Sequence, residues 1–255
     1  MGAGSPGQRQ APPVKPSSLL SLAIGLALAF VCATAGRSRQ QPAASAAFPL
    51  SQGTYWLYDG LVRWRVPGAT EHAEKEVHWR MEVRQVIRRN AIVGAVVRGY
   101  LYDLNGAQGD VKPADRLIVQ SGENKYYLIP AFAYEKAVAR LDDPRDSLAD
   151  LVADDELILD LPLAPLKKFC GLEGMARTDG FYCWVVGEST PAALSDVKGA
   201  PAGAYTAYPI QFVTVPDATS IQFVPGLGIL SYTYRNHDTE ANTEMSLVEF
   251  HRGGR

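Results

Sequence analysis

The chain has 255 residues, of which 47% are hydrophobic and 20% are charged, and its formal net charge is −2. A mildly acidic, mixed surface favours solubility over the capture of phosphate groups, so we expect no nucleic-acid partner. About 220 residues follow the N-terminal targeting segment described below, which is enough for one sizeable core, and all-β domains often reach that size undivided.

Residues 1–35 read as a signal peptide or membrane anchor. Arg9 and Lys15 precede the apolar run from Leu19 to Val31, and Ala33-Thr34-Ala35 supplies the small-x-small pattern that a signal peptidase reads. The sequence therefore predicts export to the periplasm or cell envelope.

Three fates of this segment stay open. Cleavage after Ala35 would leave a soluble chain, whereas retention of residues 19–35 would leave an anchor at the short limit for a bilayer core of roughly 30 Å. The third is lipidation at Cys32, although Ala29-Phe30-Val31 is a poor match to the small residue that usually precedes a lipoprotein cysteine. Residues 36–47, which are small and polar, predict a flexible tether.

The first half of the folded region predicts antiparallel strands. Residues 55–58 (Tyr-Trp-Leu-Tyr) form an aromatic-rich strand, and residues 61–66 resume the extended pattern after Asp59-Gly60. Residues 77–84 alternate strictly, with Val77, Trp79, Met81 and Val83 on one side and charged residues on the other. We also expect a long strand from Ile92 to Leu104.

The middle and the last third complete the fold prediction. Residues 131–141 carry helix formers with an apolar stripe, and residues 147–152 could begin a second helical turn. Strands are expected over 181–187 and 205–215, followed by a hairpin around Pro225-Gly226-Leu227-Gly228. The prediction is a mainly β domain over 48–252, with an antiparallel curved sheet (half-barrel or barrel) and one or two short helices.

Cys170 and Cys183 form an even pair in an oxidising compartment once Cys32 is set aside. A disulfide between them would close a short loop, with two buried free thiols as the alternative. Their wide separation argues against a metal or redox site.

No catalytic motif is evident. The sequence has no Gly-x-Ser-x-Gly elbow, phosphate loop or His-Glu-x-x-His motif, and we expect no metal and no cofactor. His237 and Asp238 are the only adjacent candidates for a site assembled from distant residues, and a solvated loop is the plainer interpretation.

Aromatic residues in the expected strands are the most suggestive feature. They could line the concave side of a curved sheet and bind a lipid or another apolar ligand, or they could simply fill the core. The candidates for such a lining are Trp56, Tyr58, Trp64, Trp79, Tyr100 and Trp184.

Two signatures carry a resemblance. Phe48-Pro49-Leu50 is followed by Gly53, Trp56 and Tyr58, and residues 223–229 (Phe-Val-Pro-Gly-Leu-Gly-Ile) are followed by Tyr232. Together they resemble a group of uncharacterised exported or lipoprotein-like bacterial proteins, similar in shape to the periplasmic lipoprotein-carrier half-barrels. The resemblance brings no catalytic motif with it; it implies a curved antiparallel sheet and does not define a ligand.

These observations predict an exported cell-envelope protein that binds an apolar ligand or an envelope protein without catalysis, and that meets the membrane only through its N-terminal segment. An exported hydrolase and a structural or adhesive surface module are the alternatives.

Overall fold

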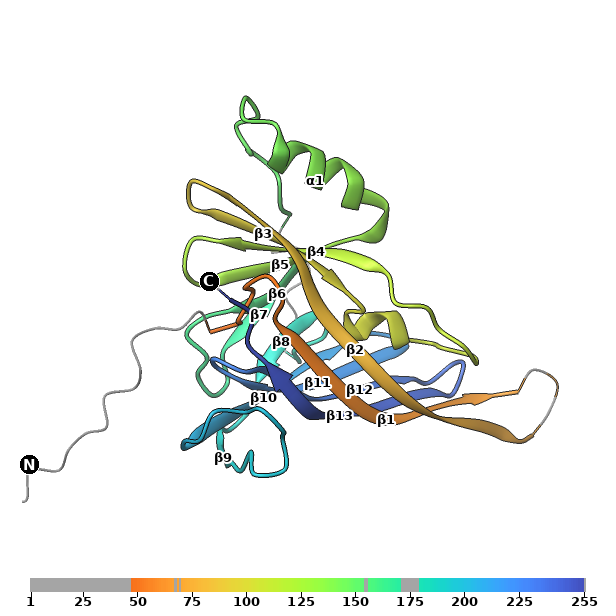
Figure 1. Ribbon diagram of the computed structural model, residues 1–255. Coiled ribbons are helices and arrows are strands. Elements are labelled where there is room, and N and C mark those ends of the chain that lie inside the picture. Colours follow the sequence, from red (N-terminus) through yellow and green to blue (C-terminus); the bar gives the residue numbers. More distant parts are fainter. Residues whose placement is uncertain (1–46, 67, 69, 154–155, 171–178, 255) are drawn as a thin grey trace, which may run out of the picture. The chain divides into compact units, whose positions relative to one another are not determined.

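The computed structural model describes residues 47–254 apart from 67, 69, 154–155 and 171–178, and a single 13-stranded sheet dominates it (Figure 1). The strands are β1 (Tyr55–Arg65), β2 (His72–Arg89), β3 (Ile92–Arg98), β4 (Asp115–Ser121), β5 (Lys125–Ile129), β6 (Leu157–Asp160) and β7 (Lys168–Cys170). They continue with β8 (Cys183–Val186), β9 (Thr190–Ala192), β10 (Tyr205–Val213), β11 (Asp217–Val224), β12 (Gly228–Asn236) and β13 (Ala241–His251).

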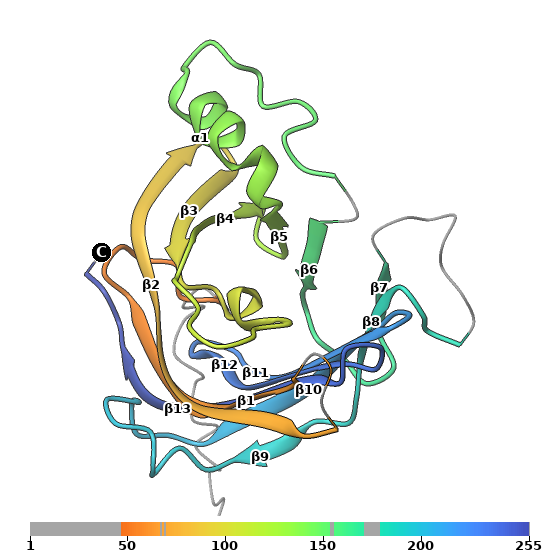
Figure 2. The same cartoon turned by 90° about the vertical axis from the view of Figure 1, so that its right-hand side faces the viewer.

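The strand order is β6-β5-β4-β3-β2-β1-β13-β12-β11-β10-β8-β7, with β9 paired to β10, and every paired strand is antiparallel. The sheet curves into a nearly closed barrel whose two end strands, β6 and β7, approach each other (Figure 2). The predicted fold class is therefore confirmed. Two meanders meet at the β1–β13 pair, which joins the first and last strands of the chain.

Alternation along each strand separates two faces of the sheet. On β2, Trp79, Met81 and Val83 are buried, while His78 and Arg80 on the other side are exposed. We call the face that carries the buried side chains the inner face and the opposite one the outer face. A Leu or Phe side chain buried in this way contributes about 1.5–3 kcal/mol of transfer free energy, so the inner face supplies most of the stability.

The expected long strand from Ile92 to Leu104 is wrong in its second half. β3 ends at Arg98, Gly99 takes a φ of +72°, and a 3₁₀ turn, η1 (Leu101–Leu104), follows. A Cβ at Gly99 would collide with the Arg80 carbonyl, so the turn requires glycine at this position. The yellow-green η1 lies inside the curve of the sheet (Figure 2).

One α-helix, α1 (Tyr134–Asp142), follows the short 3₁₀ turn η2 (Ala131–Ala133). Its buried Leu141 lies over Gly94 of β3, where a Cβ would leave it no room. The helical turn expected over 147–152 does not form. Arg89 of β2 holds this region instead, because its guanidinium donates to the carbonyls of Arg140, Asp143, Pro144 and Asp146 around the end of α1.

The predicted disulfide is present. Cys170 and Cys183 are bonded and lie directly opposite each other in the β7–β8 pair. The apolar segment 19–35 and Cys32 lie outside the described residues. Among the residues that are described, no helix is long and apolar enough to cross a bilayer.

Candidate functional site

The six aromatic residues proposed as a ligand lining do not share one open surface. Trp56, Tyr58, Trp79, Tyr100 and Trp184 are all buried, with at most 6% of the residue exposed, and Trp64 near the end of β1 is half-buried. Whether any of them meets a ligand stays a prediction; the structure shows that five of them pack within the protein.

Their polar atoms are bonded to the chain itself. Trp56 donates from Nε1 to the Leu227 carbonyl at 2.6 Å, Tyr58 donates to the Ile229 carbonyl at 2.9 Å, and Trp79 donates to the Gly99 carbonyl at 2.7 Å. Burial raises the pKa of the phenol groups of Tyr58 and Tyr100 because the charged phenolate is poorly solvated there. The hydroxyl groups therefore stay neutral at ordinary pH.

The η1 turn occupies the concave side among these rings. Leu101 and Leu104 are fully buried, and Thr243 of β13 donates to the Leu104 carbonyl at 3.0 Å. The carboxylate of Asp103, 3% exposed, accepts from Arg116 at 2.7 Å and from the Ala114 amide at 2.9 Å. This turn is therefore an integral part of the core on the concave side of the sheet.

The histidines do not assemble a catalytic site among the described residues. His237 and Asp238 lie exposed in the turn between β12 and β13, and no third group completes a catalytic arrangement with them. His72 contacts Glu240 at 2.8 Å, and both side chains are substantially exposed.

A second acid–histidine pair lies on the outer face. His78 Nδ1 contacts Asp59 Oδ1 at 2.7 Å, and the hydrogen bond to Asp59 raises the pKa of His78. Ser246 of β13 lies opposite Asp59 in the β1–β13 register, so the carboxylate lies between the serine and the histidine. A nucleophile triad needs the histidine in that middle position, so the order excludes general-base activation of Ser246 by His78.

Within the described ranges no group of three or more His, Cys, Asp or Glu side chains is placed to hold a metal ion.

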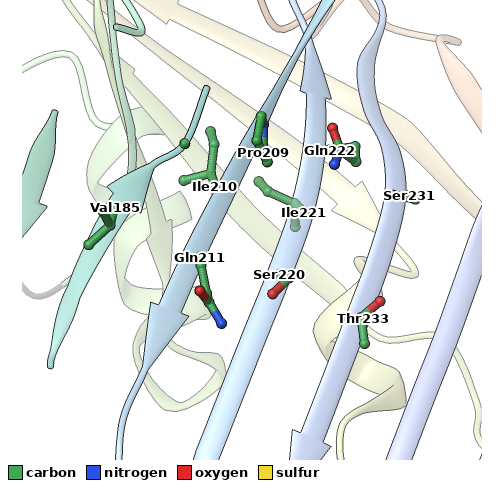
Figure 3. Close-up of a pocket in the computed structure, with 10 residues that line it drawn as sticks. Val185, Pro209, Ile210, Gln211, Ser220, Ile221, Gln222, Ser231 and Thr233 are labelled. Atoms are coloured by element: carbon green, nitrogen blue, oxygen red, sulfur yellow. The ribbon is translucent and has the colours of Figure 1, made fainter. Parts of the chain in front are cut away.

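A cavity of about 400 Å³ lies against β8, β10, β11 and β12 (Figure 3). Its polar lining comprises Gln211, Ser220, Gln222, Ser231 and Thr233, with Val185, Gly187 and Pro209 at one side. We call this surface the outer groove, because these residues alternate with the buried side chains of the same strands.

Register explains how the outer groove forms. Val185, Gln211, Ser220 and Thr233 lie directly opposite one another on four successive strands, and Gln222 and Ser231 form a second row beside Pro209 (Figure 3). Neighbouring strands lie about 4.8 Å apart, so each row offers a side chain at that spacing. The wall beside Pro209 is tight: Gly187 donates its amide to the Pro209 carbonyl at 2.7 Å, and a Cβ at Gly187 would lie 3.0 Å from the Pro209 ring.

The side chains that line the outer groove are uncharged, and its polar side chains have no hydrogen-bond partner in the described protein. None of its ten lining residues is charged or aromatic. The five polar side chains are three hydroxyls and two primary amides, and none has a hydrogen-bond partner among the described residues. Each group can both donate and accept, so the groove has hydrogen-bonding capacity that the protein leaves to solvent or to a ligand.

Sequence reasoning missed this site, although a signal existed. The outward positions of β2 carry charges, as solvated strand faces often do, but those of Ser220 to Gln222 and of Ser231 to Thr233 are hydroxyl or amide residues. A run of uncharged polar residues on adjacent strands marks a surface that is not there only for solubility. The register that brings them together could not be read from the sequence.

No protein-family model matches the chain, and no curated protein matches its sequence. Two solved structures align with it. One, from Bacteroides fragilis NCTC 9343, is described as an exported protein with a YmcC-like fold; it is 11% identical, the TM-score is 0.36, and the alignment covers 80% of this chain and 98% of that one. The other, from Parabacteroides distasonis ATCC 8503, is described as a lipoprotein; it is 10% identical, the TM-score is 0.34, and the coverage is 80% and 97%.

At these TM-scores the likenesses carry no argument about the ligand, the anchoring or the activity of this chain.

Proposed function

We propose that this chain is an exported, non-enzymatic binding protein of the bacterial cell envelope, and that it contacts its ligand through the outer groove. The observation that carries the proposal is the set of five polar side chains around a cavity of about 400 Å³, which have no partner within the described protein. Sites for small ligands commonly have volumes of about 300–1,000 Å³, so the cavity is large enough to take part of a ligand.

Export is the second component of the proposal. It rests on the apolar segment 19–31 and the Ala33-Thr34-Ala35 pattern, and the disulfide between Cys170 and Cys183 suits an oxidising compartment. Cleavage, retention and lipidation of the N-terminal segment each place the folded region outside the cytoplasm.

The test compares two isosteric changes in the full-length chain. Gln222→Glu puts a negative charge into the groove without changing side-chain size, and Gln85→Glu makes the same change at an exposed glutamine of β2. Both proteins are incubated with the lipid, glycan and protein fractions of the host envelope, and the bound material is measured. We expect one fraction to bind the native and Gln85→Glu proteins and to lose affinity for Gln222→Glu.

The proposal fails if every fraction that binds does so equally well to all three proteins. An apolar ligand held by the six aromatic candidates would give that result, and native mass spectrometry would then show a lipid on the protein.

The hydrolase alternative has its own test. Turnover of an ester, peptide or glycoside panel by the native chain, lost in His237→Ala, would assign the chain to that class instead.

A further inference from the structure

The donor and acceptor balance of the outer groove defines the chemistry of its ligand. Three hydroxyls and two primary amides line it, and each can donate one hydrogen bond and accept another at the same time. The matching ligand carries groups with the same double capacity, which are hydroxyls and amides. A ligand with acceptors alone or donors alone would leave part of the lining unpaired.

The uncharged lining disfavours ionic ligands. No lining residue is charged, so an ionised group placed in the groove would lose hydration without gaining a counter-charge. Beyond the groove, the first row continues from Thr233 to Glu244 of β13. The second row continues from Ser246 of β13 to Asp59 of β1. These carboxylates would also repel an anionic chain.

Apolar ligands and peptide strands are disfavoured for separate reasons. An acyl chain would cover five hydrogen-bonding side chains and satisfy none of them. A peptide strand binds a sheet by pairing with a free edge, but the groove lies on the face of strands whose main chains already pair with each other, as Ser220 pairs with Gln211 and Thr233.

The rows of side chains favour a linear ligand that crosses the strands. One row runs from Gln211 through Ser220 to Thr233, and the second runs from Gln222 to Ser231 and continues to Ser246 on β13. Val185 and Pro209 add apolar surface at one end, against which the C–H faces of a sugar ring can pack. A chain of linked rings would thus meet hydroxyl or amide groups strand after strand.

We infer that the outer groove binds an uncharged glycan, whose sugar rings lie across β10, β11 and β12 with their hydroxyl or N-acetyl groups on the two rows of side chains. The inference deepens the proposed function and rests on it.

The experiment uses the full-length chain and four probes: cellohexaose, chitohexaose, an oligogalacturonate of similar length as the anionic control, and phosphatidylglycerol vesicles. An array of other neutral glycans is tested in addition to cellohexaose and chitohexaose. Binding is measured by calorimetry, and its position by amide chemical-shift changes. We expect a neutral glycan to bind, to shift the amides of Ser220, Gln222 and Ser231, and to bind Gln222→Glu about tenfold more weakly while Gln85→Glu is unaffected.

A neutral glycan that binds equally to both variants, or binding by no neutral glycan on the array, overturns the inference. If oligogalacturonate or vesicles bind and Gln222→Glu alone loses them, the groove is a binding site, and the inference of an uncharged glycan as its ligand is wrong. If no envelope fraction depends on Gln222, the proposed function itself fails. Melting temperatures of the two variants, which we expect to match that of the native chain, exclude unfolding as the cause of lost binding.

Discussion

The two faces of β10, β11 and β12 differ in burial and in chemistry. Ile221, Phe223 and Tyr232 on the inner face are nearly inaccessible to solvent, and Tyr232 bonds to Asn105 beside η1. One residue away along the same strands, Ser220, Gln222 and Ser231 face outward without partners. Because side chains alternate along a strand, one backbone carries both surfaces, and the protein can vary its outer chemistry without disturbing its core.

The comparison predicts that stability depends on the inner face and binding on the outer face. The four predictions below test that separation, from the largest expected effect on stability to the smallest.

Truncation of the inner face should have the largest effect. The Phe223 ring, 1% exposed, packs edge-on against Phe48 with the centroids 5.8 Å apart, so Phe223→Ala leaves a cavity in the core. We expect the free energy of unfolding to fall by about 3–5 kcal/mol, measured by urea denaturation. A loss below about 1 kcal/mol would mean that the inner face is not the packed core described here.

Loss of the disulfide should rank next. Cys170→Ser with Cys183→Ser releases a loop with a sequence separation of 13, and the chain-entropy model then predicts a loss of about 3 kcal/mol. Thermal unfolding with and without reductant measures it. Reduction should lower the melting temperatures of the native and Gln222→Glu proteins by the same amount, since the bond lies at the β7–β8 edge of the sheet.

Alkaline pH should weaken the packing of the inner face. Burial raises the pKa of Tyr58 and Tyr232, and burial together with the hydrogen bond to Asp217 raises the pKa of Tyr234 to about 12. Above pH 10 the unfolded chain releases these protons and the folded chain retains them, so the stability they confer is present below pH 10 and is lost as the pH rises further.

Each such tyrosine can remove up to about 1.4 kcal/mol of unfolding free energy per pH unit in that range. Denaturant titrations at pH 8, 10 and 11 measure this loss, and Tyr234→Phe should reduce it. The polar side chains of the outer groove do not titrate, so ligand affinity should stay constant from pH 6 to pH 9.

Substitutions in the outer groove should have the smallest effect on stability. Ser220→Ala and the isosteric Thr233→Val remove hydroxyls that bond to nothing in the described protein, so we expect the free energy of unfolding to change by no more than about 0.5 kcal/mol. Urea denaturation checks this, with Ser246→Ala as a neighbouring outer-face control. A larger loss would show that these hydroxyls have a structural role.

The comparison also shows which features a sequence can reveal. Alternation at Val77, Trp79, Met81 and Val83 predicted the two faces of β2 correctly, and the even pair of Cys170 and Cys183 in an exported chain predicted their bond. A local pattern was sufficient for the first, and the cysteine count together with the oxidising compartment for the second. The long strand through Leu104 was wrong because Gly99 permits a backbone turn that the surrounding apolar residues do not indicate.

The pairing of strands that lie far apart in the sequence could not be predicted. The aromatic residues of β1 and β2 were compatible with a ligand lining and with a core, and that choice depends on η1, whose position the sequence does not encode locally. The outer groove depends on the pairing of β8, β10, β11 and β12 in register, since a shift of one residue would turn Ser220 inward.

The most direct test of the central claim is a residue-by-residue map of binding. Amide chemical shifts of the full-length chain are recorded before and after addition of the envelope fraction that it binds. The account predicts changes concentrated at Gln211, Ser220, Gln222, Ser231 and Thr233, with the amides of Trp56, Tyr58 and Trp79 unchanged. Changes centred on those three inner-face residues would contradict it and would place the ligand on the concave side of the sheet.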